Sequence, residues 1–281
     1  LFMPGGDFYL NVAIRTLSCQ QQNKGSPAEL GVGSGVVANS SGPAEWNECL
    51  LKSDFLHYRR LHTEVFETML WQGSFLWLEA HLSRLEQSSH YFSIPFDGPA
   101  VRHQLGELEA SFEQGEYRVR LGIDITGQVE LQSTKLELIG WGRPRLKLLI
   151  SAGSVDSKNR YQYHKTDYRP LYEPGFKAAT EAGFDEVLFL NEMGSVVEGA
   201  ISNIFIRSGS TWVTPPVSSG LLAGIWRQNY LESNLAIEEV ITMDRLLAAS
   251  EILMGNSLRL GGKVGEIWFN GALIWQAEGE S

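Results

Sequence analysis

The chain has 281 residues, of which 43% are hydrophobic, so it is long enough to bury one or two sizeable cores. Its formal net charge of −10 makes a nucleic-acid backbone or an anionic membrane an unfavourable partner. Local arginines can still bind an anionic small molecule.

Cysteine and histidine usage excludes further classes of protein. Cys19 and Cys49 are too few for a disulfide framework and lack metal-ligand spacing, which favours a reduced cytoplasmic setting. The histidines form no HExxH or similar pattern, so we expect no metal site. We also expect no signal peptide, and no apolar run approaches the roughly 18 residues of a membrane span.

Residues 1–57 form a first predicted segment. Residues 8–17 alternate like a strand, residues 31–42 (GVGSGVVANSSG) predict a glycine-rich strand and turn, and residues 43–56 predict a helix. Pro43 would lie near the first turn of that helix, where its missing N–H does no harm. Such a strand–strand–helix fragment is too small to close a core of its own.

Residues 58–150 predict a first α/β domain. We expect a strand at 62–71, a turn at Gln72-Gly73, a returning strand at 74–78 and a helix at 79–92. After a turn at 95–98 we expect a helix at 100–112, a hairpin of 117–124 with 129–134, and a strand at 147–153. We interpret residues 154–160 as a linker between domains.

Three arginines of this domain are candidate ligands for anions. Arg84 lies off the apolar stripe of its helix, so the pattern alone is also consistent with a solvated surface arginine. Arg118 and Arg120 alternate with apolar residues and therefore share one face of a strand. They could bind a substrate carboxylate or lie on the wet side of a sheet, and the pattern leaves both open.

Residues 151–281 predict a second α/β domain built on a meander. Strands at 186–190 and 195–199 flank the turn NEMG, and strands at 202–206 and 211–215 flank SGS. A helix should follow Gly224, with a short helix at 243–250 and a strand at 251–255. Residues 266–275 predict a hairpin around Asn270-Gly271.

One stretch, residues 159–203, combines a lysine with a distant carboxylate. Lys165 lies in HKTDYR, and Glu198 lies in VVEGAISN after an apolar strand and a turn. Downstream, TPP, LLAGIWR and NSLR supply hydroxyls or free backbone N–H groups at a helix start. Such hydroxyl and N–H groups could bind a phosphate beside a lysine that forms a Schiff base.

The order of these segments, from about Tyr58 to the end, resembles the fold-type IV pyridoxal-phosphate enzymes. They include branched-chain and D-amino-acid aminotransferases and 4-amino-4-deoxychorismate lyase, and HKTDYR and NSLR lean toward the lyase. The resemblance implies an α/β (α+β) fold of two α/β domains, with pyridoxal 5′-phosphate in the cleft between them. It also implies a homodimer that acts on a small-molecule substrate.

The resemblance assigns roles to the residues that match the family motifs. Lys165 would form the Schiff base and act as the base, and Glu198 would face the pyridine nitrogen. The phosphate would be bound by Arg84 of HLSRL, by the backbone N–H groups of Ile225 and Trp226, and by the Ser257 hydroxyl.

Further roles concern the substrate. Arg259, in NSLR, is the first candidate to bind a substrate carboxylate, and Arg118 and Arg120 are further candidates. His164 and Thr166 flank the lysine and could assist proton transfer or be structural.

Residues 1–57 resemble another family, the C-terminal end of the chorismate-utilising synthase components of aminodeoxychorismate and anthranilate synthesis. The matching pieces are IRT (14–16), GVGSGVVANS, and the run Glu45, Glu48 and Lys52. Asn39 stands where that family usually carries aspartate, and the several hundred preceding residues of such a domain are absent. We therefore expect a remnant or the end of a fusion rather than an active chorismate site, with an aminodeoxychorismate synthase component as a candidate partner.

Three hypotheses for the function follow: an aminodeoxychorismate lyase, a class IV aminotransferase of the branched-chain or D-amino-acid type, and an inactive remnant. Lyase relatives often carry HKTTNR, whereas Asp167 and Tyr168 stand here. Pro170 stands where many transaminase relatives carry a tyrosine that reaches the cofactor, which argues against the branched-chain type. Pro174-Gly175 is expected to break the helix after the lysine.

Overall fold

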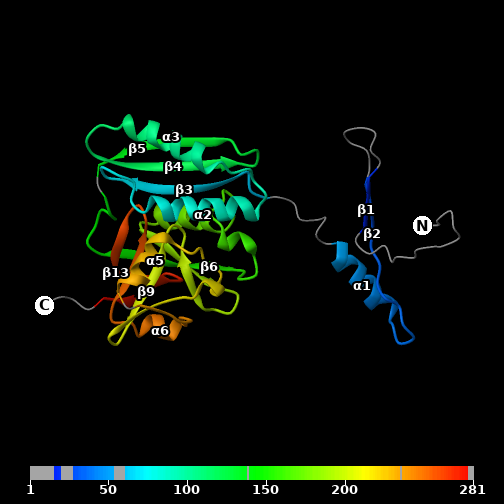
Figure 1. Ribbon diagram of the computed structural model, residues 1–281. Helices are drawn as coiled ribbons and strands as arrows, with labels where there is room; N and C mark the ends of the chain where they lie inside the picture. Colours follow the sequence, from blue (N-terminus) through cyan, green and yellow to red (C-terminus); the bar gives the residue numbers. More distant parts are fainter. Residues whose placement is uncertain (1–15, 20–27, 54–60, 138, 235, 278–281) are drawn as a thin grey trace. The chain divides into compact units, whose positions relative to one another are not determined.

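The computed structural model describes residues 16–19, 28–53, 61–137, 139–234 and 236–277 (Figure 1). The chain divides into two compact units, Leu1–Leu61 and His62–Ser281. Tyr58, the expected start of the second part, and residues 8–15 of the first expected strand lie outside the described residues.

The first unit contains a small antiparallel sheet and one helix. β1 (Thr16–Cys19) pairs with β2 (Ala28–Gly31). α1 (Gly42–Ser53) confirms the expected helix, and Pro43 lies in its first turn. None of the α1 side chains is buried.

The glycine-rich stretch of this unit is not the strand that we expected. Only Gly31 belongs to β2, and residues 32–37 adopt no regular structure before the turn that follows. Gly33 and Gly35 account for this, because glycine loses much backbone entropy in a strand and has no side chain to pack. The stretch is tied to α1 instead, since Lys52 Nζ donates a hydrogen bond to Gly33 O at 2.8 Å.

The second unit begins with a three-stranded antiparallel sheet in the order β3-β4-β5. β3 (Glu64–Trp71), β4 (Glu116–Asp124) and β5 (Val129–Leu136) confirm the expected strand and hairpin. α2 (Leu78–Tyr91) and α3 (Gly98–Ala110) pack against this small sheet through a shared apolar cluster. Figure 1 shows α2 lying alongside β3.

The returning strand expected at 74–78 is wrong. Phe75 makes only an isolated bridge to Trp71, and the chain then turns directly into α2. Trp77, at the start of the helix, has a φ of 54°, which is left-handed backbone. A left-handed residue cannot continue an extended strand, so the start of the helix prevails over the aromatic, strand-like composition of the segment.

The rest of the unit forms a nine-stranded mixed sheet, with β14 attached to β13 and the other strands in the order β11-β10-β9-β12-β13-β6-β7-β8. Its strands are β6 (Leu146–Val155), β7 (Glu186–Asn191), β8 (Val196–Gly199), β9 (Asn203–Ser208), β10 (Thr211–Thr214), β11 (Ile237–Glu238), β12 (Ile252–Asn256), β13 (Leu260–Phe269) and β14 (Ala272–Gln276). The helices are α4 (Tyr172–Glu181), α5 (Ile225–Ser233) and α6 (Met243–Leu247), with short 3₁₀ turns at Arg160–Tyr163 and Val217–Ser219.

Most of the expected meander is confirmed, including the hairpin whose turn residues Asn270 and Gly271 have φ values of 50° and 78°. The expected linker at 154–160 is wrong at its start. Ser154 and Val155 belong to β6 and pair with β7, so the expected domain boundary after residue 150 falls inside a strand.

Pro174 and Gly175 do not break the helix after the lysine, so that expectation is also wrong. α4 begins at Tyr172, which places Pro174 in the first turn, where its missing N–H costs no helical hydrogen bond. At Gly175 an added Cβ would lie 3.0 Å from the Phe189 ring, so glycine allows α4 to pack closely on β7.

The second unit is therefore a mixed α/β fold with two sheets, as expected. Among the described helices, none combines the length and the apolar character that crossing a membrane requires.

Candidate active site

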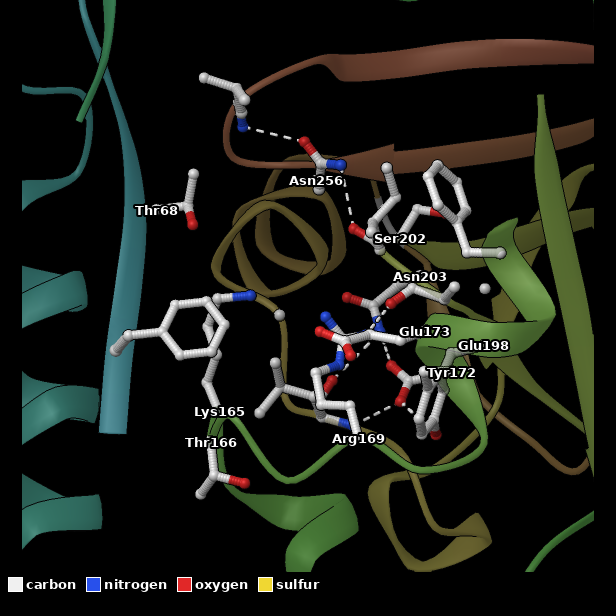
Figure 2. A pocket seen from close by; sticks show the side chains of 18 of the residues that line it. Thr68, Lys165, Thr166, Arg169, Tyr172, Glu173, Glu198, Ser202, Asn203 and Asn256 are labelled. Carbon is white, nitrogen blue, oxygen red and sulfur yellow. Dashed lines mark hydrogen bonds between the residues drawn. The ribbon is translucent and has the colours of Figure 1, made fainter. Parts of the chain in front are cut away.

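A cavity of about 1100 Å³ is lined by residues of both sheets of the second unit. The small sheet contributes Glu64, Phe66, Thr68, Arg118 and Arg120. The other side comes from residues of the segments 154–176, 198–203, 222–225 and 256–259. Figure 2 shows Lys165 on one side of this pocket, with Glu198 and Tyr172 across from it.

Lys165 is held by its backbone against β3. Phe66 N donates to Lys165 O at 3.0 Å, and Thr166 forms a bridge with Val65. The Asp167 carboxylate accepts from the backbone N–H of Thr63 at 2.8 Å. Asp167, which departs from the pattern of the lyase relatives, therefore ties the lysine segment to the start of β3.

The side chain of Lys165 is partly buried and carries a perturbed amine. Its Nζ lies 4.8 Å from the centre of the Phe66 ring, and no carboxylate forms an ion pair with it among the described residues. Burial lowers the pKa of Lys165 from 10.5 to about 7, and the charges of Arg169 and Arg84 lower it as well. A large fraction of this amine is thus neutral near pH 7, the form that attacks a carbonyl and accepts a proton.

Glu198, at the end of β8, is buried and held by three donors. Tyr172 Oη donates to Oε1 at 3.0 Å, Asn203 Nδ2 donates to Oε2 at 3.1 Å, and Leu222 N donates to Oε1 at 3.2 Å. Burial raises the pKa of Glu198 to about 7, while the hydrogen bond from Leu222 N–H is the strongest opposing influence. This carboxylate is suited to binding a protonated ring nitrogen.

The turn after Glu198 is organised by a second buried carboxylate, Glu186. Glu186 accepts from Ala200 N at 3.0 Å, Ile201 N at 3.2 Å and Ser202 Oγ at 2.7 Å. An added Cβ at Gly199 would lie 2.8 Å from the Glu186 carboxylate, so only glycine fits there. In this conformation the turn exposes the carbonyl oxygen of Ala200, which accepts a hydrogen bond from the Arg169 guanidinium.

An anion site lies at the start of α5. Its first-turn N–H groups, those of Ile225 and Trp226, follow Gly224, which as N-cap has no side chain to cap them. The Arg84 guanidinium donates to Ala223 O at 2.9 Å, so it stands beside this helix start. Ser257 is buried and lines the same cavity.

Arg259 follows this region and lies on an aromatic support. Its guanidinium carbon is 5.0 Å from the Trp141 ring centre, and the Trp141 indole N–H donates to Leu260 O at 3.2 Å. Asn256 Oδ1 accepts from Arg259 N at 2.7 Å and so shapes the turn. Arg259 has no carboxylate partner among the described residues.

The two strand arginines, which the sequence pattern left open, both line the cavity but differ in their partners. Arg120 forms an ion pair with Glu64 and lies 4.4 Å from the Phe66 ring centre. Arg118 is exposed and forms no ion pair with any described residue. Arg118 is therefore the freer of the two to bind a substrate.

His164 and Thr166 flank the lysine in different environments. The His164 ring stacks on Tyr91 at 4.3 Å between ring centres, and its Nδ1 lies 3.0 Å from Ser88 Oγ. Burial lowers the pKa of His164 to about 4, so the imidazole is neutral at pH 7. Thr166 Oγ1 is buried and has no hydrogen-bond partner among the described residues.

The cavity thus brings together nearly all the expected site residues: Lys165, Glu198, Arg84, Ile225, Ser257, Arg259, Arg118, Arg120, His164 and Thr166. The Trp226 side chain is the exception, because it is buried against Gly255 and Phe205 and only its backbone N–H can serve an anion.

Sequence reasoning missed Glu67, Arg169, Tyr172 and Thr68, and gave Asn203 no firm role. Glu67 carried a readable signal, since it lies between Val65 and Met69 on the apolar face of an alternating strand. Arg169 and Tyr172 follow the lysine by a few residues, but no pattern predicted that they would face Glu198.

The sequence profile of the family described as amino-transferase class IV matches residues 64–267, and the chain belongs to this family. The profile of the chorismate binding enzymes matches residues 1–58. The class IV family depends on pyridoxal phosphate.

Among individual relatives, the aminodeoxychorismate lyase of Bacillus subtilis is 30% identical over 219 residues, which cover 69% of this chain and 74% of that protein. A Schizosaccharomyces pombe protein provisionally named aminodeoxychorismate lyase is 28% identical over 203 residues, 70% of this chain and 87% of its own. A Mesorhizobium loti structure provisionally named an amino-acid aminotransferase has a TM-score of 0.67 and 29% identity, and covers 73% of this chain and 99% of its own.

The cavity fits pyridoxal phosphate. It offers at Lys165 an amine that forms no ion pair with a described residue, a buried carboxylate at Glu198, and a helix start without a side-chain cap beside Arg84. These groups match the aldehyde, the ring nitrogen and the phosphate of the cofactor in charge and in hydrogen-bonding character.

Proposed function

We propose that this protein is a 4-amino-4-deoxychorismate lyase, which releases pyruvate and p-aminobenzoate, a reaction of folate biosynthesis. The observation that carries the proposal is the content of the cavity. It combines Lys165 and Glu198 with Arg118 and Arg259, two arginines without a carboxylate partner among the described residues. A substrate with two carboxylates suits such a pair.

The extent of the sequence matches supports the lyase over the branched-chain aminotransferases. The two relatives named as lyases align over 203 and 219 residues. Relatives named branched-chain-amino-acid aminotransferases align over only 81 to 151 residues. The lyase is therefore the better proposal for the whole unit.

The residues that would hold the cofactor are those that line the anion site and the opposite wall. Arg84, the N–H groups of Ile225 and Trp226, and the Ser257 hydroxyl would bind its phosphate, and Glu198 would bind its ring nitrogen. When bound, pyridoxal phosphate supplies an aldehyde that condenses with amines and a ring that accepts electrons.

Lys165 is the proposed base. Its neutral Nζ would take the proton from the ring carbon that bears the substrate amine, while the bond from the ring to the enolpyruvyl oxygen breaks. The departing enolpyruvate then takes up a proton and becomes pyruvate. Loss of pyruvate makes the ring aromatic, which drives the reaction forward. Phe66, under the amine, keeps water from one side of it and so favours the neutral form.

Arg259 and Arg118 are proposed to bind the substrate carboxylates. Arg120 is a weaker candidate, because Glu64 already neutralises its charge. His164 is neutral at pH 7 and could exchange a proton beside the base, whereas Thr166 is too deeply buried to touch a substrate without rearrangement.

An aminotransferase remains the second candidate, because the Mesorhizobium loti structure is 29% identical and carries an aminotransferase name. Such an enzyme would need an amino donor and a keto acid. An inactive remnant is the third candidate. A homodimer, a cytoplasmic location and an aminodeoxychorismate synthase component as partner belong to the proposal as well.

The deciding experiment measures pyruvate release from enzymatically generated aminodeoxychorismate after addition of pyridoxal phosphate. We expect pyruvate and p-aminobenzoate to appear in equal amounts without any amino donor. Amino exchange with keto acids and no pyruvate would identify the aminotransferase. A protein that binds no cofactor and performs neither reaction would be the inactive remnant.

A further inference from the structure

A buried carboxylate lies on the face of β3 that points away from the cavity. Glu67 is 1% exposed and stands between Val65 and Met69, which are both fully buried. Its neighbours on the opposite face of the strand, Phe66 and Thr68, line the cavity. An ionisable group in a core position costs stability unless it is paired, so Glu67 calls for an explanation.

The partners of Glu67 both come from α2. His81 Nδ1–H donates to Oε2 at 2.7 Å, and Arg84 donates from Nε to Oε1 at 2.7 Å and from Nη2 to Oε2 at 2.6 Å. His81 and Arg84 are three residues apart, so they lie on one face of the helix. Although burial alone would raise the pKa of Glu67, Arg84 and His81 hold it at about 2, and the group is an anion.

This pairing leaves part of the Arg84 guanidinium for another anion. Arg84 has five N–H bonds, of which two are donated to Glu67 and one to Ala223 O. Ala223 directly precedes Gly224, the N-cap of α5, so the guanidinium stands at the first turn of that helix. Within the described residues, nothing accepts its remaining N–H bonds.

We infer that Glu67, together with His81, is a positioning residue that fixes Arg84 as the group by which the protein selects the phosphorylated form of its cofactor. A free arginine side chain loses rotamer entropy when it binds a phosphate. Here a buried two-point pair removes that freedom before the phosphate arrives. Glu67 thus acts through Arg84 and touches neither cofactor nor substrate. The inference rests on the phosphate placement proposed above and is independent of the lyase reaction.

The test compares two ligands that differ only in the phosphate. Cofactor-free protein is titrated with pyridoxal phosphate and, separately, with pyridoxal, and the dissociation constants are read from the change in absorbance. Glu67→Gln should weaken binding of pyridoxal phosphate by about tenfold or more, as expected for losing a buried charged hydrogen bond, and leave pyridoxal within about twofold. Glu79→Gln is the matched control, because Glu79 lies on the same helix as His81 and Arg84 but forms an exposed ion pair with Arg102 of α3.

Two further variants separate positioning from a merely structural role. Arg84→Met should weaken the binding of pyridoxal phosphate more than that of pyridoxal. The double variant Arg84→Met with Glu67→Gln should show no further loss of this preference, because Glu67 acts through Arg84. If Glu67→Gln does not fold, His81→Leu takes its place, with a smaller selective loss expected. His81→Asn, which keeps a donor near Nδ1, should restore the selectivity.

The outcomes are distinguishable. If Glu67→Gln, or His81→Leu, raised the dissociation constants of pyridoxal phosphate and pyridoxal equally, Glu67 and His81 would only stabilise the fold. That result would overturn the inference. Unchanged selectivity in Arg84→Met would overturn the phosphate placement on which the inference rests. A change in Arg84→Met alone, with none in Glu67→Gln, would leave Arg84 as the phosphate ligand and remove Glu67 from its support. None of these results depends on pyruvate release.

Discussion

The two sides of the cavity differ in chemistry. On the small-sheet side, the charges of Glu64 and Arg120 neutralise each other, and Phe66 adds an apolar ring. On the large-sheet side, the described residues that donate hydrogen bonds to Glu198 are all neutral groups. Glu64 is therefore paired with a cation, whereas Glu198, held by neutral donors, has a pKa of about 7.

Lys165 joins the two sides. Its backbone is bonded to β3 of the small sheet, while its amine is subject to the charges of Arg169 and Glu198 from the other side. The pKa values of Lys165 and Glu198 thus meet at about 7 from opposite directions. The two groups with a pKa near 7 thus belong to the lysine segment and to the large-sheet side. The small sheet holds the lysine backbone and contributes Arg118 to the cavity, and the variants below test this division.

The largest effect is expected from Lys165→Ala. Removing the amine takes away both the Schiff base and the base, so turnover should fall by at least about a thousandfold. The absorbance of the cofactor bound to the lysine should also disappear. Lys177→Ala is the control, because Lys177 is an exposed lysine of the following helix and should leave both properties unchanged. A normal cofactor band in Lys165→Ala would remove this lysine from the proposal.

Glu198→Gln should have the second largest effect. An amide cannot hold the ring nitrogen in its protonated form, so turnover should drop by about a hundredfold while the affinity for the cofactor changes far less. Steady-state kinetics together with a cofactor titration measure the two quantities. Turnover close to that of the natural protein would refute the proposed role.

Much of this arrangement was predictable from the chain. The strands and turn around Glu198 and the helix start after Gly224 are local patterns, and they formed as expected. The alternation of β4 also placed Arg118 and Arg120 on one face, and both line the cavity. Local sequence therefore predicted these elements, while the roles of the candidate residues stay predictions.

The remainder depends on contacts between distant segments. The pairing of Arg84 with Ala223 links residues far apart in the chain, and nothing near Arg84 predicts it. The same holds for Asp167, whose bonds to the start of β3 explain why this position can depart from the pattern of the relatives. At residues 74–78 the local composition misled the prediction. The segment has a strand-like composition, but Trp77 adopts a left-handed backbone conformation and the chain enters α2 instead.

The next largest effect is expected from a comparison of the two arginines of β4. Arg118→Gln should raise the KM for the substrate by about tenfold, because an exposed arginine that forms no ion pair with a described residue is free to bind a carboxylate. Arg120→Gln should raise KM less and lower the thermal midpoint instead, since it leaves Glu64 without its cation. Equal effects on KM would show that the Glu64 pair does not set Arg120 apart.

The pH dependence of cofactor capture tests the lysine. Because the pKa of Lys165 is lowered to about 7, its neutral fraction rises about tenfold per pH unit below that value and levels off above it. The rate at which cofactor-free protein captures pyridoxal phosphate should follow the same curve and be flat above about pH 8. A rate that keeps climbing toward pH 10 would indicate an ordinary, solvated lysine.

The smallest effect is expected from Tyr172→Phe. The Tyr172 hydroxyl donates to Glu198 and lowers its pKa, so its removal should move the pKa of Glu198 upward from about 7. The ionised form is then lost at a higher pH, and turnover at pH 7 should fall by roughly threefold to tenfold.

The loss in Tyr172→Phe should shrink as the pH rises toward 9, because Glu198 is ionised there with or without the hydroxyl. Tyr163→Phe, which removes a hydroxyl that donates to Ser157 O, is the matched control and should not move the profile. A loss in Tyr172→Phe that is the same at every pH would point to altered packing of α4. The pKa of Glu198 would then be lowered by the Leu222 N–H and by the charges of Arg169 and Lys165 rather than by the Tyr172 hydroxyl.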